Sequence, residues 1–313
     1  MMELLRVAGE PELAEIGVLR FRGDDRCCVE TVDGLTPPQP RLSKWIVNVS
    51  TQFGCPVGCP FCDAGLAFHG NPTADELLAQ VRWALGRHPG VPGRCAKLKV
   101  HFARMGEPAL NDAVLQALER LPEVAGSPGL WACVATTAPQ GREAWFERLV
   151  ELKERRYHGR FQLQFSVQST RPEDRARLTP IPHWSLARIA DYGARFWRPG
   201  DRTVVLNFAL ARDVAFEPEV LTATFDPERF AVKITPVNPT ARGAAAGFAT
   251  VLRSERAAAI ERAREALLDR GFDVVLSVGE ADEDRIGSNC GQAVRVARPS
   301  RSRAAAAVPA EPA

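Results

Sequence analysis

The chain has 313 residues, 45% of them hydrophobic, and a formal net charge of +2. This length suffices for one large α/β domain or two ordinary domains, and the apolar content supplies a sizeable core. The nearly neutral charge indicates no nucleic-acid footprint. No run of about eighteen apolar residues occurs, and acidic residues interrupt the N-terminus, so neither a membrane span nor a secretory signal is expected. We therefore expect a cytoplasmic protein.

The predicted elements begin with a hairpin. Strand patterns over residues 16–21 and 27–32 flank the turn signal Gly23-Asp24-Asp25. Prolines between residues 37 and 40 then end regular structure. Residues 1–44 are therefore predicted to be a small N-terminal β-hairpin extension.

From residue 45 onward, strand patterns alternate with helix patterns. Strands are expected at 46–49, 96–102, 130–136, 161–167, 203–210, 230–235 and 273–278, and helices at 110–121, 142–155, 185–196, 218–225 and 253–270. A further helix begins at Thr73, which forms a capping box with Glu76. This α/β alternation is typical of a parallel sheet and predicts a partial (β/α)6 TIM-like barrel over residues 45–296. Residues 297–313 lack periodicity and are predicted to be a disordered tail.

Three of the eight cysteines lie directly after the first strand of this unit. Cys55, Cys59 and Cys62 have the spacing C-x3-C-x2-C, which lets one loop place three thiolates around an iron–sulfur cluster. A four-iron cluster normally takes four thiolates. Three would leave one iron open to a small molecule.

Other uses of these cysteines stay open. A structural zinc site could use the same three thiolates with His69 as the fourth ligand. Disulfides are disfavoured, because no secretory signal precedes the cysteines and three clustered thiols cannot all pair with one another.

The cysteine spacing, with Phe61 just before the last cysteine, resembles the signature of the radical S-adenosylmethionine (SAM) enzymes. The resemblance implies that the open iron binds the amino and carboxylate groups of SAM, and that one electron splits SAM into methionine and a 5′-deoxyadenosyl radical. It therefore implies a [4Fe-4S] cluster and SAM as cofactors. It also implies a reducing partner of the flavodoxin or ferredoxin type.

A second motif, Arg104 to Asn111, follows the second strand of this unit. Gly106 would let a ligand approach the backbone, Glu107 offers an acceptor for an ammonium group, and Pro108 suits the start of a helix. The run resembles the Gly-Glu-Pro element that holds the SAM amino group in this superfamily. Its fuller Met-Gly-Glu-Pro-x-Leu-Asn form is similar to one branch, the radical SAM ribosomal-RNA adenine methyltransferases.

Later stretches also resemble that branch. Thr137, Ser166 and Asn238 occupy matching positions near strand ends, which implies that they hydrogen-bond SAM. Strand-end capping remains the alternative for Thr137 and Ser166, and a turn role for Asn238. The run Ser288 to Gln292 is similar to the branch's Ala-Cys-Gly-Gln. This match implies that Cys290 accepts a methyl group from SAM and presents it to the substrate.

Two features depart from that branch. Asn48 stands seven residues before Cys55, where the branch has a second cysteine that releases the product, and an amide cannot act as a thiolate nucleophile. In addition, only 44 residues precede Trp45, where the branch carries a helical RNA-binding module. We therefore expect a radical SAM enzyme acting on a small metabolite or peptide, with RNA less expected.

Two alternative functions stay open. One is methylation of an RNA adenine carbon through a methylated Cys290. The other is a non-enzymatic zinc or iron–sulfur protein that uses the barrel as a scaffold. The motifs do not name the substrate, because loops such as 171–184 and 240–250 would shape its pocket and no local rule predicts their conformation.

Overall fold

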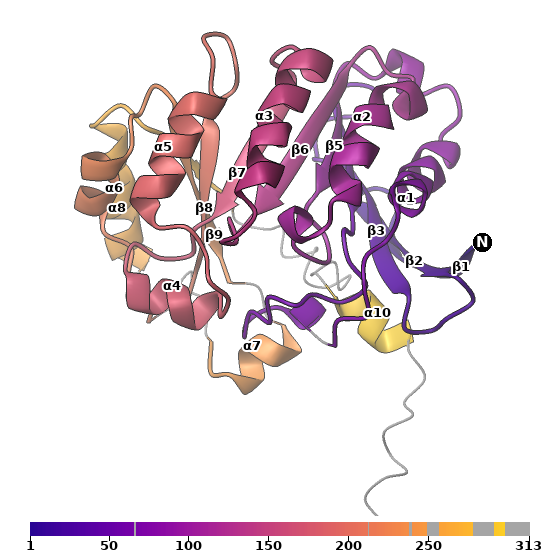
Figure 1. Ribbon diagram of the computed structural model, residues 1–313, viewed down its shortest axis with the longest axis horizontal. Helices are drawn as coiled ribbons and strands as arrows, with labels where there is room; N and C mark the ends of the chain where they lie inside the picture. Colours follow the sequence, from indigo (N-terminus) through magenta and orange to yellow (C-terminus); the bar gives the residue numbers. More distant parts are fainter. Residues whose placement is uncertain (66, 212, 238–239, 249–256, 278–290, 298–313) are drawn as a thin grey trace, which may run out of the picture.

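Ten strands form one sheet whose order follows the chain (Figure 1). The computed structural model describes residues 1–65, 67–211, 213–237, 240–248, 257–277 and 291–297. The strands are β1 (Met2–Glu10), β2 (Ala14–Phe21), β3 (Cys28–Gly34), β4 (Trp45–Val49), β5 (Leu98–Phe102), β6 (Leu130–Thr136), β7 (Phe161–Ser166), β8 (Val204–Leu210), β9 (Phe230–Pro236) and β10 (Asp273–Leu276). Pairing is antiparallel from β1 to β4 and parallel from β4 to β10.

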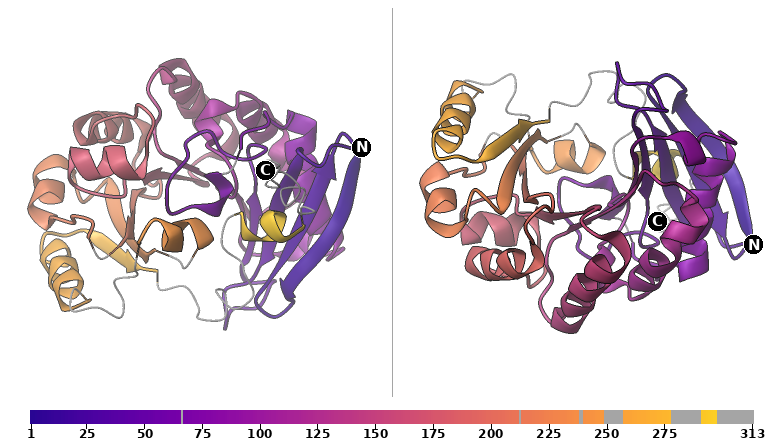
Figure 2. Two further views of the ribbon diagram at one scale, coloured as in Figure 1. Left: turned by 90° about the horizontal axis from the view of Figure 1, so that it is seen from below. Right: turned by 90° about the horizontal axis from the view of Figure 1, so that it is seen from above.

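The longer helices cover one face of this sheet (Figure 1). They are α1 (Ala74–Gly86), α2 (Ala113–Ala125), α3 (Glu143–Tyr157), α5 (Leu186–Phe196) and α8 (Ala257–Leu268), joined on that face by the seven-residue α6 (Pro218–Thr224). The other described helices are η1 (Asp63–Gly65), η2 (Pro92–Arg94), η3 (Pro108–Leu110), α4 (Pro172–Leu178), α7 (Ala241–Ala245) and α10 (Gln292–Ala297). Of these, η1, α7 and α10 lie side by side at the carboxyl ends of the parallel strands (Figure 2).

The alternation within β4 shows how the sheet separates core from site. Trp45, Val47 and Val49 are fully buried in the core under the helices, whereas Ile46 and Asn48 are only half-buried. Successive side chains of a strand point to opposite faces, so Asn48 lies on the face that the long helices leave uncovered. Its register partners are Val32 in β3 and His101 in β5. The uncovered face is therefore the one that carries polar side chains.

The structure bears out the mixed α/β class and most predicted elements. The capping box is present, since Thr73 accepts the N–H of Glu76 and Glu76 accepts that of Thr73. The barrel stays a prediction, because the strand order describes a sheet with β1 and β10 at its two ends. No described helix has the length and apolarity of a membrane span.

Some elements differ from expectation. The N-terminal hairpin is a three-stranded unit, because β1 pairs with β2 along its whole length. Helices α4 and α7 occupy the segments 171–184 and 240–250, for which no element was predicted. The predicted tail begins inside α10, which ends at Ala297, and the rest of that tail lies outside the described residues.

Candidate functional site

The loop after β4 carries the three candidate cluster ligands. Cys55, Cys59 and Cys62 are free, half-buried thiols between β4 and η1. Burial raises the pKa of Cys55 to about 12 and also raises the pKa values of Cys59 and Cys62, although backbone N–H groups at Cys55 and Cys62 partly oppose this. A thiol that is so hard to ionise becomes a thiolate only beside a strong cationic partner, and a coordinated metal supplies one.

The surroundings of these thiols fit an iron–sulfur cluster. N–H groups directed at sulfur are the usual outer shell of such clusters. The buried hydroxyl of Thr179 lies within hydrogen-bonding reach of Cys59, where it favours the thiolate and partly opposes the rise in the pKa of that thiol. A hydroxyl donor beside a ligand thiol suits sulfur that is bound to a cluster, because coordinated sulfur accepts such hydrogen bonds.

The zinc alternative has no preformed site in the described part of the chain. No three His, Cys, Asp or Glu side chains there converge closely enough to hold a single metal ion. The proposed fourth ligand, His69, is within electrostatic reach of Asp24, in the turn between β2 and β3. Metal analysis of the purified protein decides this alternative.

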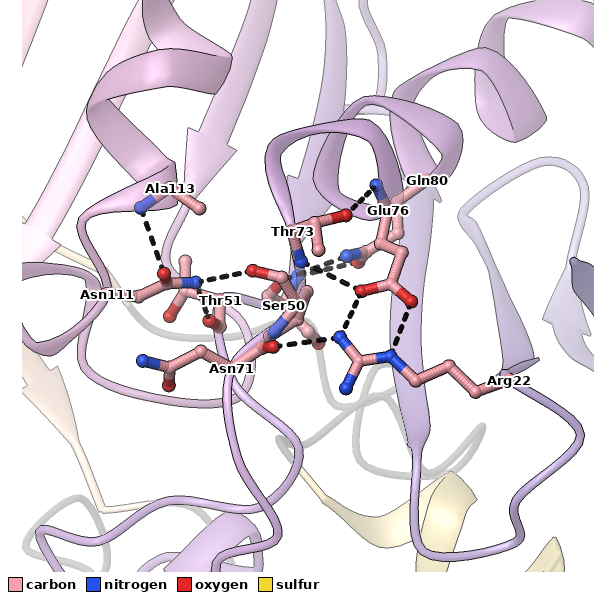
Figure 3. A network of polar contacts seen from close by, with 10 residues as sticks. Arg22, Ser50, Thr51, Asn71, Thr73, Glu76, Gln80, Asn111 and Ala113 are labelled. Carbon is pink, nitrogen blue, oxygen red and sulfur yellow. Dashed lines mark hydrogen bonds and ion pairs between the residues drawn. The ribbon is translucent and has the colours of Figure 1, made fainter.

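A polar network fixes the residues that precede the first cysteine (Figure 3). The side chain of Gln80 in α1 accepts the N–H of Ser50 and donates to its carbonyl, both at 2.9 Å. The Asn111 amide donates to the carbonyl of Thr51 at 2.9 Å. Arg22 joins the outer end of the network through an ion pair with α1. The start of the loop is therefore tied to both neighbouring βα units.

The second motif lies directly against this loop. The N–H of Glu107 donates to Gln52 Oε1 at 2.8 Å, and the N–H of Gln52 donates to the carbonyl of Met105 at 3.2 Å. Gly106 has φ +97°, and an added Cβ would lie 2.5 Å from Cβ and 2.7 Å from the backbone N of Gln52. Glycine is thus required by close packing of the two loops, which differs from the predicted reason of ligand approach.

Glu107 is a buried carboxylate surrounded by neutral donors. It accepts hydrogen bonds from the hydroxyl of Thr136 at 2.5 Å, from the N–H and hydroxyl of Thr137 at 2.7 and 2.9 Å, and from the N–H of Ala109 at 3.0 Å. Burial raises its pKa, and the hydrogen bonds partly oppose that effect. No ion pair joins it to a described cationic side chain. Such a group is suited to accept the ammonium of a ligand.

The other predicted cofactor residues lie at this end of the sheet in different roles. Thr137 orients Glu107 through two hydrogen bonds, so its direct contact with SAM stays a prediction. Pro108 begins η3, as expected of a proline at a helix start. Ser166 ends β7, half-buried beside Asn207.

Phe61 connects the cysteine loop to α7. Its ring packs edge-on against Phe248 with centroids 6.1 Å apart, and its carbonyl accepts the hydroxyl of Thr240 at 2.7 Å. The predicted cofactor role of Phe61 is therefore accompanied by a packing role. Asn238 and Cys290 lie outside the described residues, so their predicted roles also stay predictions.

Two functional residues were missed by sequence reasoning. The carboxylate of Asp63 accepts the N–H groups of Ala241 and Arg242 at 3.2 and 2.9 Å, at the start of α7. The guanidinium of Arg242 in turn donates to the carbonyls of Gly58 and Gly65 in the cysteine loop. The only signal in the sequence was an acidic residue directly after Cys62.

Comparisons with known proteins show which proteins the chain resembles. No family model matches the chain. It is 31% identical over 234 residues, 70% of its own length, to "Probable dual-specificity RNA methyltransferase RlmN" of Thermobifida fusca, and it spans 60% of that relative. It is 32% identical over 277 residues to the protein of the same name from a Parafrankia species, which covers 82% of this chain and 67% of the relative.

The fold also has a solved counterpart. A crystal structure of a radical SAM methyltransferase from Sphaerobacter thermophilus superposes with a TM-score of 0.72. The match covers 93% of this chain and 80% of the other, at 24% identity. At that identity the likeness supports the fold alone.

Proposed function

The chain belongs to the RlmN branch of the radical SAM methyltransferases, and we propose that it methylates an unsaturated carbon of an RNA base. The family uses a [4Fe-4S] cluster and SAM, so the predicted enzyme class and cofactors are confirmed. The names of the relatives point to RNA, whereas a small metabolite or peptide was expected from the sequence. That expectation becomes the second candidate.

The buried carboxylate of Glu107 is the structural observation that carries the SAM-binding part of this proposal. It lies on the loop that packs against the cysteine loop. No described cationic side chain pairs with this buried carboxylate, and the ammonium group of an amino acid would supply the positive charge. The two Thr137 hydrogen bonds, both to Oε2, fix the orientation of the carboxylate before any ligand arrives. Glu107 would therefore bind and orient the SAM amino group at the cluster.

The proposed division of labour follows from the chain's own groups. Cys55, Cys59 and Cys62 would hold the cluster, which when bound supplies one electron to SAM. A flavodoxin or ferredoxin type of protein would deliver that electron, and a cytoplasmic location would suit the oxygen sensitivity of the cluster. Asp63 accepts a backbone N–H of α7, and Arg242 of α7 donates to a loop carbonyl, so the two residues together keep the loop in shape.

Asn48 favours the second candidate. In the mechanism implied by the family, Cys290 carries the methyl group, and a second thiolate at position 48 releases the product. The half-buried amide of Asn48 cannot do this, so release would need another nucleophile or a substrate that needs none. A small metabolite or peptide substrate is therefore retained beside RNA.

Anaerobic reconstitution followed by reduction in the presence of SAM tests the radical chemistry. We expect 5′-deoxyadenosine from the wild type and none from Cys55→Ala, Cys59→Ala or Cys62→Ala. Cys95→Ala removes a buried thiol elsewhere in the core and should retain the activity. Absence of 5′-deoxyadenosine from wild type that contains a cluster would refute the proposal, and one zinc per chain would support the scaffold alternative.

Labelled methyl-SAM and total RNA separate the two substrates. Label in a methylated RNA base, lost in Cys290→Ala while SAM cleavage continues, would support the main proposal. Efficient SAM cleavage with unlabelled RNA and an unmodified Cys290 would contradict it and favour the second candidate.

A further inference from the structure

The segment that directly follows Cys290 is anchored by a residue from the N-terminal part of the chain. The carboxylate of Glu30, in β3, accepts the N–H of Gly291 at 3.0 Å and the N–H of Val294 at 2.9 Å. These amides belong to the first turn of α10, where backbone N–H groups have no partner within the helix. Glu30 thus accepts the first and the last of the N–H groups in that turn.

Glu30 is itself held by a buried ion pair. Arg104, just before the Gly-Glu-Pro element, places its guanidinium 2.7 Å from Glu30 Oε2. The side chain of Glu30 is 0% exposed and that of Arg104 only 9%. Met105, the residue after Arg104, belongs to the same apolar cluster as Cys62. The pair therefore sits between the cluster loop, the SAM-binding loop and α10.

Packing holds α10 in the same place. A separate apolar cluster joins the inner face of β2 and β3 to the cysteine loop and to α10; its buried members are Ala14, Ile16, Val18, Cys28, Val32, Ala64, Met105, Ala293 and Val294. Gly291 has φ +90°, and an added Cβ would lie only 2.3 Å from the backbone N of Ala64. The chain after Cys290 therefore lies directly on the chain after Cys62.

We propose that the Glu30–Arg104 pair positions the segment following Cys290 against the cluster loop. The antiparallel strands β2 and β3 provide the surface on which this segment packs. The segment that the pair holds begins at Gly291, the residue that follows Cys290 in the sequence. The functional part of this proposal rests on the proposed function, in which Cys290 carries the methyl group. The structural part does not.

The plain alternative is that the pair only stabilises the fold. Hydrogen exchange of the full-length protein distinguishes the two. In Glu30→Gln the amide oxygen can replace only one carboxylate oxygen, so the NH2 group faces either the N–H of Val294 or the N–H of Gly291 together with Arg104. We expect the peptide that spans residues 291–297 to exchange roughly ten- to a hundredfold faster, with β5 to β8 unchanged.

Controls keep this test decisive. Glu12→Gln removes the same charge from an exposed position of the N-terminal unit and should leave exchange unchanged. If Glu30→Gln is too unstable to purify, the double variant Glu30→Gln/Arg104→Met removes the unpaired charge and should still expose the α10 amides. Unchanged exchange in α10, or an increase spread evenly over the sheet, would overturn the positioning role.

A functional readout tests the same pair. Glu30→Gln should keep the visible absorbance of the cluster and the rate of 5′-deoxyadenosine formation, but lower the methylated fraction of Cys290 at least about tenfold. Arg104→Lys, which keeps the charge, should rescue more methylation than Arg104→Met. Equal loss of cleavage and methylation would contradict a positioning role. A wild type without SAM cleavage would instead refute the proposed function and leave the exchange result standing.

Discussion

Glu107 is a carboxylate buried among neutral hydrogen-bond donors. Burial raises its pKa, so it takes up a proton at a pH where an exposed glutamate is still ionised. The contribution of Glu107 to the free energy of unfolding is greatest below the pKa that it has in the unfolded chain. That contribution is lost as the pH rises through the pKa of the folded state. The pH dependence of binding a cationic ammonium group runs the opposite way, because only the ionised carboxylate attracts it.

We therefore predict that SAM binds more weakly as the pH falls from neutral towards the raised pKa of Glu107. Below that pKa the Kd should grow by about tenfold per pH unit. Anaerobic equilibrium dialysis of cluster-loaded protein measures this. Glu107→Gln should bind SAM weakly at every pH, and an unchanged pH slope in that variant would assign the titration to another group.

Gly106 is the residue where backbone geometry limits substitution most clearly. Gly106→Ala combines a positive φ with a Cβ 2.5 Å from Gln52, so we expect the free energy of unfolding to fall by about 1–3 kcal/mol. Gly90 also has a positive φ, but an added Cβ there would have nothing within 4 Å. In urea denaturation Gly90→Ala should therefore cost less, and an equal loss in both variants would exclude the clash with Gln52 as the cause.

At the scale of elements, α7 braces the cysteine loop although it is only five residues long. Asp63 accepts two N–H groups at the start of α7, and Arg242 of α7 returns two hydrogen bonds to loop carbonyls. The helix α7 depends on its contact with the cysteine loop, because a helix of this length is not stable in isolation. The loop in turn depends on the hydrogen bonds from α7. The cluster loop and α7 should therefore order together.

Asp63→Asn should weaken this contact, because an asparagine oxygen can replace only one of the two acceptors. Residues that orient metal ligands typically contribute about 10- to 100-fold to metal affinity, so we expect iron to be lost to a chelator at least about tenfold faster. Absorbance under anaerobic chelator challenge follows the loss. Asp226→Asn alters a half-exposed turn carboxylate remote from the loop and should match wild type. Equal rates in both variants would remove Asp63 from the site.

On the scale of the whole molecule, the N-terminal strands and the parallel strands are one sheet. Asp33 in β3 joins them, since it accepts the indole N–H of Trp45 at 2.7 Å, lies 2.7 Å from His88 Nε2, and pairs with Arg41. The N-terminal strands also provide the surface on which α10 packs. Residues 1–44 therefore contribute to the site as part of the same sheet, and they pack against the cluster loop.

Asp33→Asn should lower the free energy of unfolding of the whole chain by about 3 kcal/mol, because it leaves buried polar groups without their charged partner. A single cooperative transition should persist and move to lower denaturant concentration. Asp25→Asn, which affects an exposed ion pair with Arg20, should cause no measurable shift. Two separate transitions in Asp33→Asn would show that the N-terminal strands unfold independently.

Local sequence patterns were enough for the parallel part of the fold. Apolar alternation and caps such as Thr73 predicted most strands and helices, because they depend on residues a few positions apart. By contrast, β1 shows no clean alternation of burial, and α7 and α10 have only five and six residues. Elements of this kind depend on packing against distant parts of the chain, which no local pattern records.

The cysteine spacing and the Gly-Glu-Pro run were enough to predict the cofactors, because each is a short motif of residues close together in the chain. Only the tertiary structure showed what holds those motifs in place. Gln52 and Glu107 are 55 residues apart, and Glu30 and Val294 are 264 apart, yet each pair is joined by a hydrogen bond. Such contacts form when the sheet brings its strand ends together. Because the two residues of each pair are far apart in the chain, no local sequence pattern predicts that they meet.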